Sequence, residues 1–218
     1  NTRVSYPIHH IENALDKSVA GHPTNIFFLT CDAFGVLPPI SRLSPEQAAY
    51  FFISGYTAKV AGTELGIDEP VPSFSAGFGA PFLPLHPGKY ADMLSDKMQR
   101  HGVRVWLVNT GWANGPYGVG SRIKLKYTRA MITAALNGEL DQVEYHQHSI
   151  FGIAQPASCP NVPSDILSPR ASWNNDEAFY KQANKLATAF NNNFKKYEAG
   201  VSDAVKQAAP VLVQEIPA

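Results

Sequence analysis

Asn25-Ile-Phe-Phe-Leu-Thr-Cys31 is the stretch that decides the fold, because it is a nearly unbroken apolar run with the length of one strand. Arg104-Val-Trp-Leu-Val-Asn109 is a second run of the same kind. Such runs are typical of strands that are buried on both faces, as in a parallel or mixed sheet. They predict an α/β protein with a mixed sheet and flanking helices, and no repeat or linker divides the chain.

Helix signals lie between and after these strands. Ser44-Pro45-Glu46-Gln47 combines an N-cap serine, a first-turn proline and a capping-box glutamine ahead of a helix over 48–55. His86-Pro87 predicts the start of a second helix, and residues 126–136 predict a third that ends at the left-handed turn of Asn137-Gly138. A long amphipathic helix then presents one apolar face, which we interpret as core packing: Phe179, Ala183, Leu186, Phe190, Phe194 and Tyr197.

Two stretches lack helix or strand periodicity. Residues 66–84 are rich in proline, glycine and phenylalanine, which favours a lid or a binding loop over plain disorder. Residues 110–121 are rich in glycine, and Gly115 to Ser121 have the spacing of a phosphate-binding loop. However, Ser121 stands where that motif needs its lysine, and no helix follows at once. We therefore expect either a flexible loop near a ligand or an ordinary surface loop.

Composition excludes several classes of protein. Lys+Arg and Asp+Glu number 18 each, and a net charge of zero argues against a dedicated nucleic-acid binder, although Arg122 to Arg129 form a local basic segment. No apolar stretch approaches the ~20 residues that span a bilayer, and no cationic leader opens the chain. We expect a cytoplasmic protein. The first residue is Asn1, which favours a piece cut from a longer polypeptide, with methionine removal or processing as alternatives. The two cysteines, Cys31 and Cys159, are too few for a disulfide framework, and Cys31 is predicted to be a buried free thiol because it lies in an apolar run.

Histidines and arginines are the candidate functional residues. His146-Gln147-His148 would place two imidazoles on one face of a strand, but no third ligand has suitable spacing, so we predict no metal site in this chain. Arg3 precedes an apolar run, and Arg122 follows the glycine-rich loop. A guanidinium suits phosphates and carboxylates, so each arginine has either a functional role or ordinary surface pairing.

Several segments, taken in order, resemble the C-terminal part of ATP-dependent phosphoenolpyruvate carboxykinases. The resemblance covers Asn1 to about Tyr197, and together its segments are highly specific. They are Asn1-Thr-Arg-Val-Ser-Tyr-Pro7, Leu29-Thr-Cys-Asp-Ala-Phe-Gly-Val-Leu-Pro-Pro39, Ser54-Gly-Tyr-Thr-Ala-Lys-Val-Ala-Gly-Thr-Glu64, Leu85-His-Pro87, Val108-Asn-Thr-Gly-Trp112 and Arg122-Ile-Lys-Leu-Lys-Tyr-Thr-Arg129. The resemblance implies that residues 1–218 are the C-terminal portion of a carboxykinase nucleotide-binding domain.

That family converts oxaloacetate and ATP to phosphoenolpyruvate, ADP and carbon dioxide in gluconeogenesis, with Mg²⁺ and Mn²⁺. Residue by residue, the resemblance implies that Arg3 contacts the transferring phosphoryl group and that Arg122, Ile123 and Thr128 line the adenine pocket. It implies that residues 66–84 form a mobile loop over the cleft. Ser121 stands where close relatives often carry lysine before the arginine, so the resemblance implies a different nucleotide affinity or loop mobility here.

The resemblance also implies that the phosphate-binding loop, the metal ligands and the oxaloacetate-binding arginine precede Asn1. The missing N-terminal portion of the enzyme is then the principal partner, and an incomplete sheet is expected to self-associate. An alternative interpretation is a non-catalytic α/β nucleotide-binding or interaction module on the same scaffold. An upstream coding region with a glycine-rich loop carrying Lys-Ser or Lys-Thr would favour the enzyme.

Overall fold

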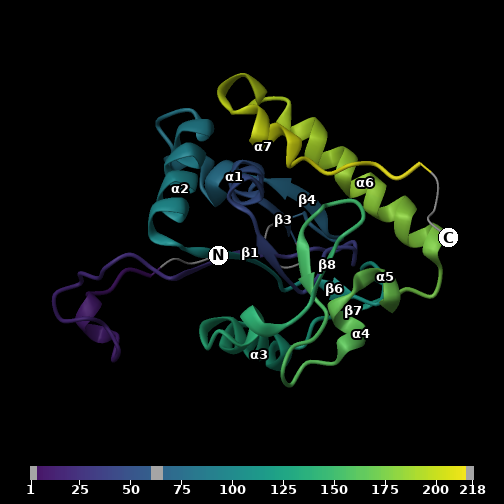
Figure 1. Cartoon of the computed structure of the whole chain (residues 1–218), viewed down its shortest axis with the longest axis horizontal. Coiled ribbons are helices and arrows are strands. Elements are labelled where there is room, and N and C mark those ends of the chain that lie inside the picture. The colour runs from purple at the N-terminus through teal and green to yellow at the C-terminus, as the bar shows by residue number, and fades with distance from the viewer. Residues whose placement is uncertain (1–3, 60–65, 215–218) are drawn as a thin grey trace.

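The computed structural model describes residues 4–59 and 66–214, and its centre is a five-stranded sheet in the order β1-β5-β2-β9-β8 (Figure 1). β1 (Asn25–Thr30) and β5 (Arg104–Asn109) pair in parallel, whereas β2 (Ile40–Leu43) pairs with β5 antiparallel. β9 (Ala154–Pro156) and β8 (Tyr145–Gln147) continue the sheet antiparallel. The predicted mixed α/β fold is therefore confirmed.

The two apolar runs are both strands, but their environments differ. β5 is buried from its second residue onward and lies between β1 and β2. β1 is the edge strand of the sheet within the described part of the chain, and Leu29 is 58% exposed. The expectation that both runs are buried on both faces is thus wrong for β1, because no described element covers the outward side of Leu29.

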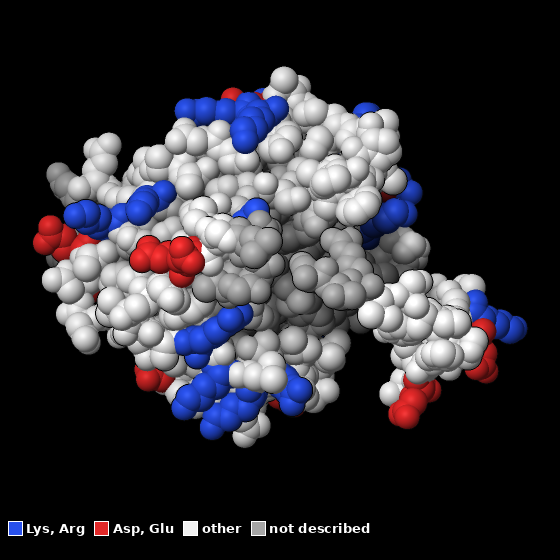
Figure 2. Space-filling model, turned by 180° about the vertical axis from the view of Figure 1, so that it is seen from behind, with Lys and Arg blue, Asp and Glu red and all other residues white. Residues whose placement is uncertain are grey.

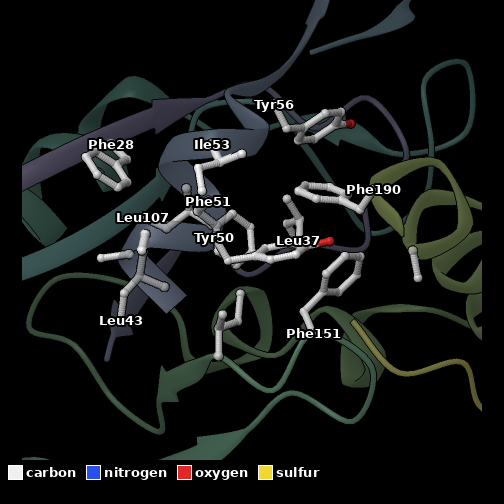
Figure 3. Packing of buried hydrophobic residues seen from close by; sticks show 14 of the residues in the cluster. Phe28, Leu37, Leu43, Tyr50, Phe51, Ile53, Tyr56, Leu107, Phe151 and Phe190 are labelled. Carbon is white, nitrogen blue, oxygen red and sulfur yellow. The ribbon is translucent and has the colours of Figure 1, made fainter. Parts of the chain in front are cut away.

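Helices cover both faces of the sheet (Figure 1). β5 shows how the faces divide, because Val105 and Leu107 join one apolar cluster while Trp106 and Val108 join another. The first cluster lies under α1 (Pro45–Ser54), α2 (Pro87–His101), α6 (Asp176–Phe194) and α7 (Asp203–Gln207). The second lies under α3 (Leu125–Leu136), η4 (Glu139–Gln142) and α4 (Ser164–Leu167). The larger of the two clusters is rich in aromatic rings (Figure 3).

Local signals fix the helix ends as predicted. The hydroxyl of Ser44 accepts from the amide of Gln47 at 3.2 Å, and the Gln47 side chain accepts from the amide of Ser44 at 3.0 Å. These two bonds complete the capping box of α1. α2 begins at Pro87, and α3 is followed by Gly138 in the left-handed region at φ 75°. The apolar stripe of α6 is buried, while Tyr197 lies beyond the helix and packs against the core.

Residues 66–84 carry more structure than the sequence predicts. β4 (Val71–Phe74) pairs with β3 (Tyr56–Lys59), and the 3-10 turns η2 (Ala76–Phe78) and η3 (Ala80–Phe82) follow. The expectation of a loop without strand or helix is therefore wrong, because backbone pairing with a strand distant in sequence leaves no local signal. Whether the segment closes over a ligand stays a prediction.

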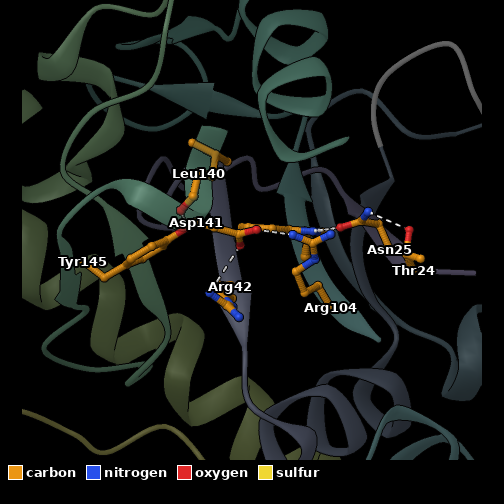
Figure 4. Close-up of polar contacts among 8 residues, drawn as sticks. Thr24, Asn25, Arg42, Arg104, Leu140, Asp141 and Tyr145 are labelled. Atoms are coloured by element: carbon orange, nitrogen blue, oxygen red, sulfur yellow. Dashed lines mark hydrogen bonds and ion pairs between the residues drawn. The ribbon is translucent and has the colours of Figure 1, made fainter. Parts of the chain in front are cut away.

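Asp141 joins the helical layer to the sheet on the α3 side (Figure 4). Its carboxylate pairs with Arg104 on β5 and, at 3.6 Å, with Arg42 on β2. Beside it, the indole N–H of Trp106 donates to the Asn25 side chain at 2.9 Å. These contacts tie η4 to two neighbouring strands, so they fix how this layer lies on the sheet.

The segment before β1 lies away from the body of the molecule as an arm (Figure 1). Apart from the 3-10 turn η1 (Ile8–His10), it has no helix or strand among residues 4–24. Its exposed apolar side chains include Val4, Tyr6, Ile8, Leu15 and Val19. Over residues 4–59 and 66–214, no helix combines the length and apolar character that a bilayer crossing needs.

Candidate functional site

The candidate site lies where the parallel strands β1 and β5 end. Ligands of open α/β sheets bind at the carboxyl ends of such strands, outside the sheet. Here the strands end at Thr30 and Asn109, and the loops that follow are in contact with each other. The hydroxyl of Thr110 donates to the carbonyl of Thr30 at 3.0 Å, and the amide of Thr110 donates to the same oxygen at 2.9 Å.

Asp32 organises the loop after β1. The residue is fully buried, and its carboxylate accepts from the amides of Val36 and Leu37, both at 2.8 Å, and from the amide of Phe34 at 2.9 Å. The hydroxyl of Tyr56 donates a fourth bond at 3.1 Å. Burial raises the pKa of the Asp32 carboxyl above its usual value, and these four bonds oppose the rise because they favour the ionised form.

Asn109 joins the two loops. Its side-chain oxygen accepts from the amide of Asp32 at 2.9 Å and from the amide of Gly111 at 2.8 Å, while its side-chain N–H₂ donates to the carbonyl of Leu37 at 3.0 Å. The residue is fully buried, so each lost bond would leave a buried polar group without its partner. Gly111 has to be glycine, because a Cβ there would overlap the backbone of Asp32.

A short hairpin follows and carries Arg122, one of the predicted ligand-binding residues. β6 (Trp112–Ala113) pairs antiparallel with β7 (Ser121–Arg122), so Trp112 stands opposite Arg122. The amide of Trp112 donates to the carbonyl of Asp32 at 2.8 Å. The intervening turn is not a phosphate-binding loop, because no helix follows Ser121 until α3 begins at Leu125.

Arg122 is held in place although its side chain is exposed. Its Nε donates to the carbonyl of Thr110 at 3.0 Å, and its guanidinium carbon lies 5.2 Å from the centre of the Trp112 ring. A terminal nitrogen lies 3.7 Å from the sulfur of Cys31, which is buried and free as predicted. Burial raises the pKa of the Cys31 thiol, and the charge of Arg122 opposes that rise. The bond to the carbonyl of Thr110 and the contact with the Trp112 ring together fix the plane of the guanidinium.

Arg122 and Ile123 meet at a pocket of about 180 Å³. The Ile123 side chain is 8% exposed, and its amide donates to the carbonyl of Gly111 at 2.8 Å. The pocket is completed by residues of the hairpin, the start of α3 and the segment around α4, namely Ala113, Asn114, Ser121, Lys124, Tyr127, Pro163, Asp165 and Ile166. An arginine plane beside an apolar side chain offers a slot suited to a flat ring with polar edges.

The other predicted site residues are placed differently. Thr128 is 7% exposed in the first turn of α3, its amide donates to the carbonyl of Lys124 at 3.3 Å, and it is not among the residues that line the pocket. Arg3 lies outside the described residues. The structure thus brings Arg122 and Ile123 together. The roles of Arg3, Arg122, Ile123 and Thr128 stay predictions.

The surface near the pocket is basic. Lys124, Lys126 and Arg129 are exposed along the start of α3, next to Arg122. Figure 2 shows lysine and arginine side chains gathered low on the rear face, where α3 lies in the turned view of Figure 1. Clustered cations attract anionic ligands such as phosphates even where the net charge of the whole chain is zero.

The histidine pair does not form a metal site. His148 is buried, and its Nε2 lies 2.9 Å from the carbonyl of Val36, whereas His146 is exposed on β8. The Nδ1 of His148 accepts from the amides of Ile150 and Phe151 at 3.2 and 3.3 Å. Both ring nitrogens are therefore engaged by backbone groups. Over the described ranges, no group of three His, Cys, Asp or Glu side chains could hold a metal ion.

Sequence reasoning missed Asp32, Asn109 and Trp112 as parts of this site. A signal was present for two of them, because Asp32 closely follows one apolar strand run and Asn109 ends the other. The carboxyl ends of neighbouring parallel strands meet at one edge of a sheet, so polar residues there are candidates for a common site.

Fold and pocket together define a mixed α/β protein with a basic pocket at the carboxyl ends of its parallel strands. The sequence model of the family described as phosphoenolpyruvate carboxykinase matches residues 1–165. The chain therefore belongs to the phosphoenolpyruvate carboxykinase family.

Curated relatives agree with this assignment. The protein named phosphoenolpyruvate carboxykinase (ATP) of Flavobacterium johnsoniae is 64% identical over 211 residues, which cover 97% of this chain and 40% of that relative. The proteins of the same name from Thermus thermophilus and Geobacillus thermodenitrificans are 57% and 55% identical, covering 96% and 98% of this chain and again 40% of each relative. The chain spans about two fifths of the length of the curated relatives it matches.

Proposed function

We propose that this chain is the adenine-facing portion of an ATP-dependent phosphoenolpyruvate carboxykinase. The observation that carries the proposal is the arrangement of Arg122 and Ile123 at one pocket, with the guanidinium held by the carbonyl of Thr110 and the ring of Trp112. Support for the nucleotide comes from the names of the relatives, which specify ATP.

The protein would act in the cytoplasm, and the exposed apolar arm over residues 4–24 would favour self-association of the isolated chain.

In the proposed reaction, oxaloacetate loses carbon dioxide and the electron pair of the broken carbon–carbon bond forms an enolate. The enolate oxygen then attacks the γ-phosphorus of ATP, the bond to the β-phosphate oxygen breaks, and phosphoenolpyruvate and ADP result. Arg3 would contact the transferring phosphoryl group, while Arg122, Ile123 and Thr128 would hold the adenine. The described residues offer no ligand set that fits the family's Mg²⁺ and Mn²⁺, so no step of the reaction is assigned to a metal.

Arg122→Ala tests the pocket. In the full-length polypeptide that we propose carries this chain, we expect the KM for ATP to rise about tenfold, because a cation–π and hydrogen-bonded contact with the base is lost. Steady-state kinetics of ATP-dependent decarboxylation of oxaloacetate measures the change. Arg100→Ala is the matched control, since Arg100 is an exposed arginine of α2 paired with Asp96 at 2.7 Å. Equal KM values for both variants would contradict the role of Arg122.

Arg3→Ala tests the phosphoryl contact. We expect kcat to fall roughly a hundredfold with little change in nucleotide affinity, because a charge aimed at the transferring group acts mainly in the transition state. Steady-state kinetics measures kcat, and calorimetry measures the dissociation constant for ATP. A weakened affinity with an unchanged kcat would refute the assignment.

An activity assay of the isolated 218-residue chain, run beside the full-length polypeptide, distinguishes the enzyme proposal from the alternative of a non-catalytic module. We expect the isolated chain to release no carbon dioxide from oxaloacetate above background, whereas the full-length polypeptide does so in the presence of ATP. Turnover by the purified chain, or none by the full-length polypeptide, would overturn the proposal.

A further inference from the structure

The loop that follows β1 supports the hairpin that carries Arg122. The carbonyl of Ala33 accepts from the amide of Tyr117 at 2.8 Å, and Tyr117 lies in the turn between β6 and β7. Gly35 packs directly on Gly115 at the start of that turn, where a Cβ would overlap the Gly115 carbonyl. The far end of the hairpin therefore rests on residues 33–35.

The same loop is anchored on its other side. The carbonyl of Gly35 accepts from the indole N–H of Trp173 at 2.9 Å, which joins the loop to the segment before α6. The near end of the hairpin is bound to the backbone of Asp32, through the amide of Trp112 at 2.8 Å. One short segment, residues 32–35, thus contacts the hairpin at both ends.

The Asp32 side chain holds more backbone groups of this turn than any other side chain described above. The Asp32 carboxylate accepts the amides of Phe34, Val36 and Leu37, which turns the chain tightly around the carboxylate. Three backbone donors converge on a fully buried acceptor, so removing the carboxylate would leave three buried N–H groups without this partner. An amide at this position would present an N–H₂ group to backbone donors and would loosen the turn.

We propose that Asp32 is a positioning residue for the nucleotide pocket: its buried carboxylate shapes the loop on which the β6–β7 hairpin rests, and the hairpin sets the guanidinium of Arg122. The proposal rests on the proposed function of Arg122 at the adenine. None of the four residues that donate hydrogen bonds to the Asp32 carboxylate lines the pocket, so we expect its effect on nucleotide binding to pass through the hairpin.

Asp32→Asn in the full-length polypeptide tests the proposal. We expect the KM for ATP to rise about fivefold while kcat changes less than twofold, because the displaced residue binds the base and not the reacting phosphoryl group. Leu186→Ala is the control for stability alone. Leu186 is buried on α6, so its truncation is also expected to destabilise the fold but to leave the KM for ATP unchanged. An equal KM shift in both variants, or a shift in neither, would overturn the proposal.

A double-mutant cycle separates this proposal from the one on which it rests. If Asp32 acts through Arg122, Asp32→Asn adds no further KM increase in an Arg122→Ala background. If the KM increases of the two single variants multiply in the double variant, Asp32 acts elsewhere. The positioning role would then fail while the role of Arg122 stands. An Arg122→Ala variant with the wild-type KM would refute the proposed function instead.

Tyr56→Phe covers the case in which Asp32→Asn does not fold. It removes the single hydrogen bond from the Tyr56 hydroxyl to Asp32 and leaves the three backbone bonds in place. We expect about a twofold rise in the KM for ATP, again absent in the Arg122→Ala background. An unchanged KM for Tyr56→Phe, together with a soluble and folded variant, would count against the proposal.

Discussion

Acidification from pH 6.5 to pH 4 is expected to lower the free energy of unfolding by about 3 kcal/mol through His148 alone. Burial lowers the pKa of this histidine from 6.5 to about 4. The two bonds that Nδ1 accepts from backbone amides act in the same direction, because they occupy the nitrogen that would take the proton. The bond between Nε2 and the carbonyl of Val36 opposes the fall, and burial outweighs it. The Phe151 and Phe179 rings that pack beside it offer no charge to stabilise an imidazolium.

The direction of the effect follows from the two pKa values. Above pH 6.5 the imidazole is neutral in both the folded and the unfolded chain, so it contributes no pH dependence. Between pH 6.5 and pH 4 the unfolded chain binds a proton that the folded chain does not, and the folded state loses stability as the pH falls. Below pH 4 both states are protonated and the loss is complete.

Urea denaturation of the 218-residue chain at a series of pH values measures this slope. His148→Gln is expected to be less stable than the wild type at pH 7 but to lose less stability on acidification. His146→Gln is the matched control, since that histidine is exposed two positions away and is expected to keep the wild-type slope. Parallel pH profiles for His148→Gln and the wild type would contradict the assignment.

The parts of the fold that the sequence predicts are those with a local cause. The capping box of α1 lies within four consecutive residues, and the buried strand β5 is one uninterrupted apolar run. The edge position of β1 and the pairing of β4 with β3 depend instead on contacts between segments distant in the sequence. Periodicity does not carry that information, so those two expectations were wrong.

The same distinction applies to the site. Arg122 and Ile123 are adjacent in sequence, so a resemblance over one short segment finds both. Asp32 and Asn109 are 77 positions apart, and what makes them important is a set of hydrogen bonds to backbone groups. Residue type and spacing do not reveal such bonds, although the position of each residue beside an end of an apolar strand run indicates where to look.

Phe190→Ala is expected to lower the free energy of unfolding by about 3 to 5 kcal/mol, because the substitution removes a whole ring from the core. Phe190 has no exposed surface and lies on α6 at the centre of the aromatic cluster (Figure 3). Its ring neighbours come from α1, β3, β4 and the segment after β8, and they are Tyr50, Phe51, Tyr56, Phe74 and Phe151. Removing the ring leaves a cavity that several rigid neighbours cannot fill.

Phe82→Ala is the matched control, because Phe82 is 80% exposed and its truncation is expected to change stability by less than about 0.5 kcal/mol. Urea denaturation of both variants measures the difference, and equal values would contradict the assigned core. The size of the Phe190 effect is informative in itself. The Tyr56 ring centre lies 5.0 Å from that of Phe190, and its hydroxyl donates to Asp32. A loss near the top of the range would indicate that the cavity stays open and that Tyr56 keeps its place and its bond to Asp32, whereas a smaller loss would indicate that neighbouring rings move into the cavity.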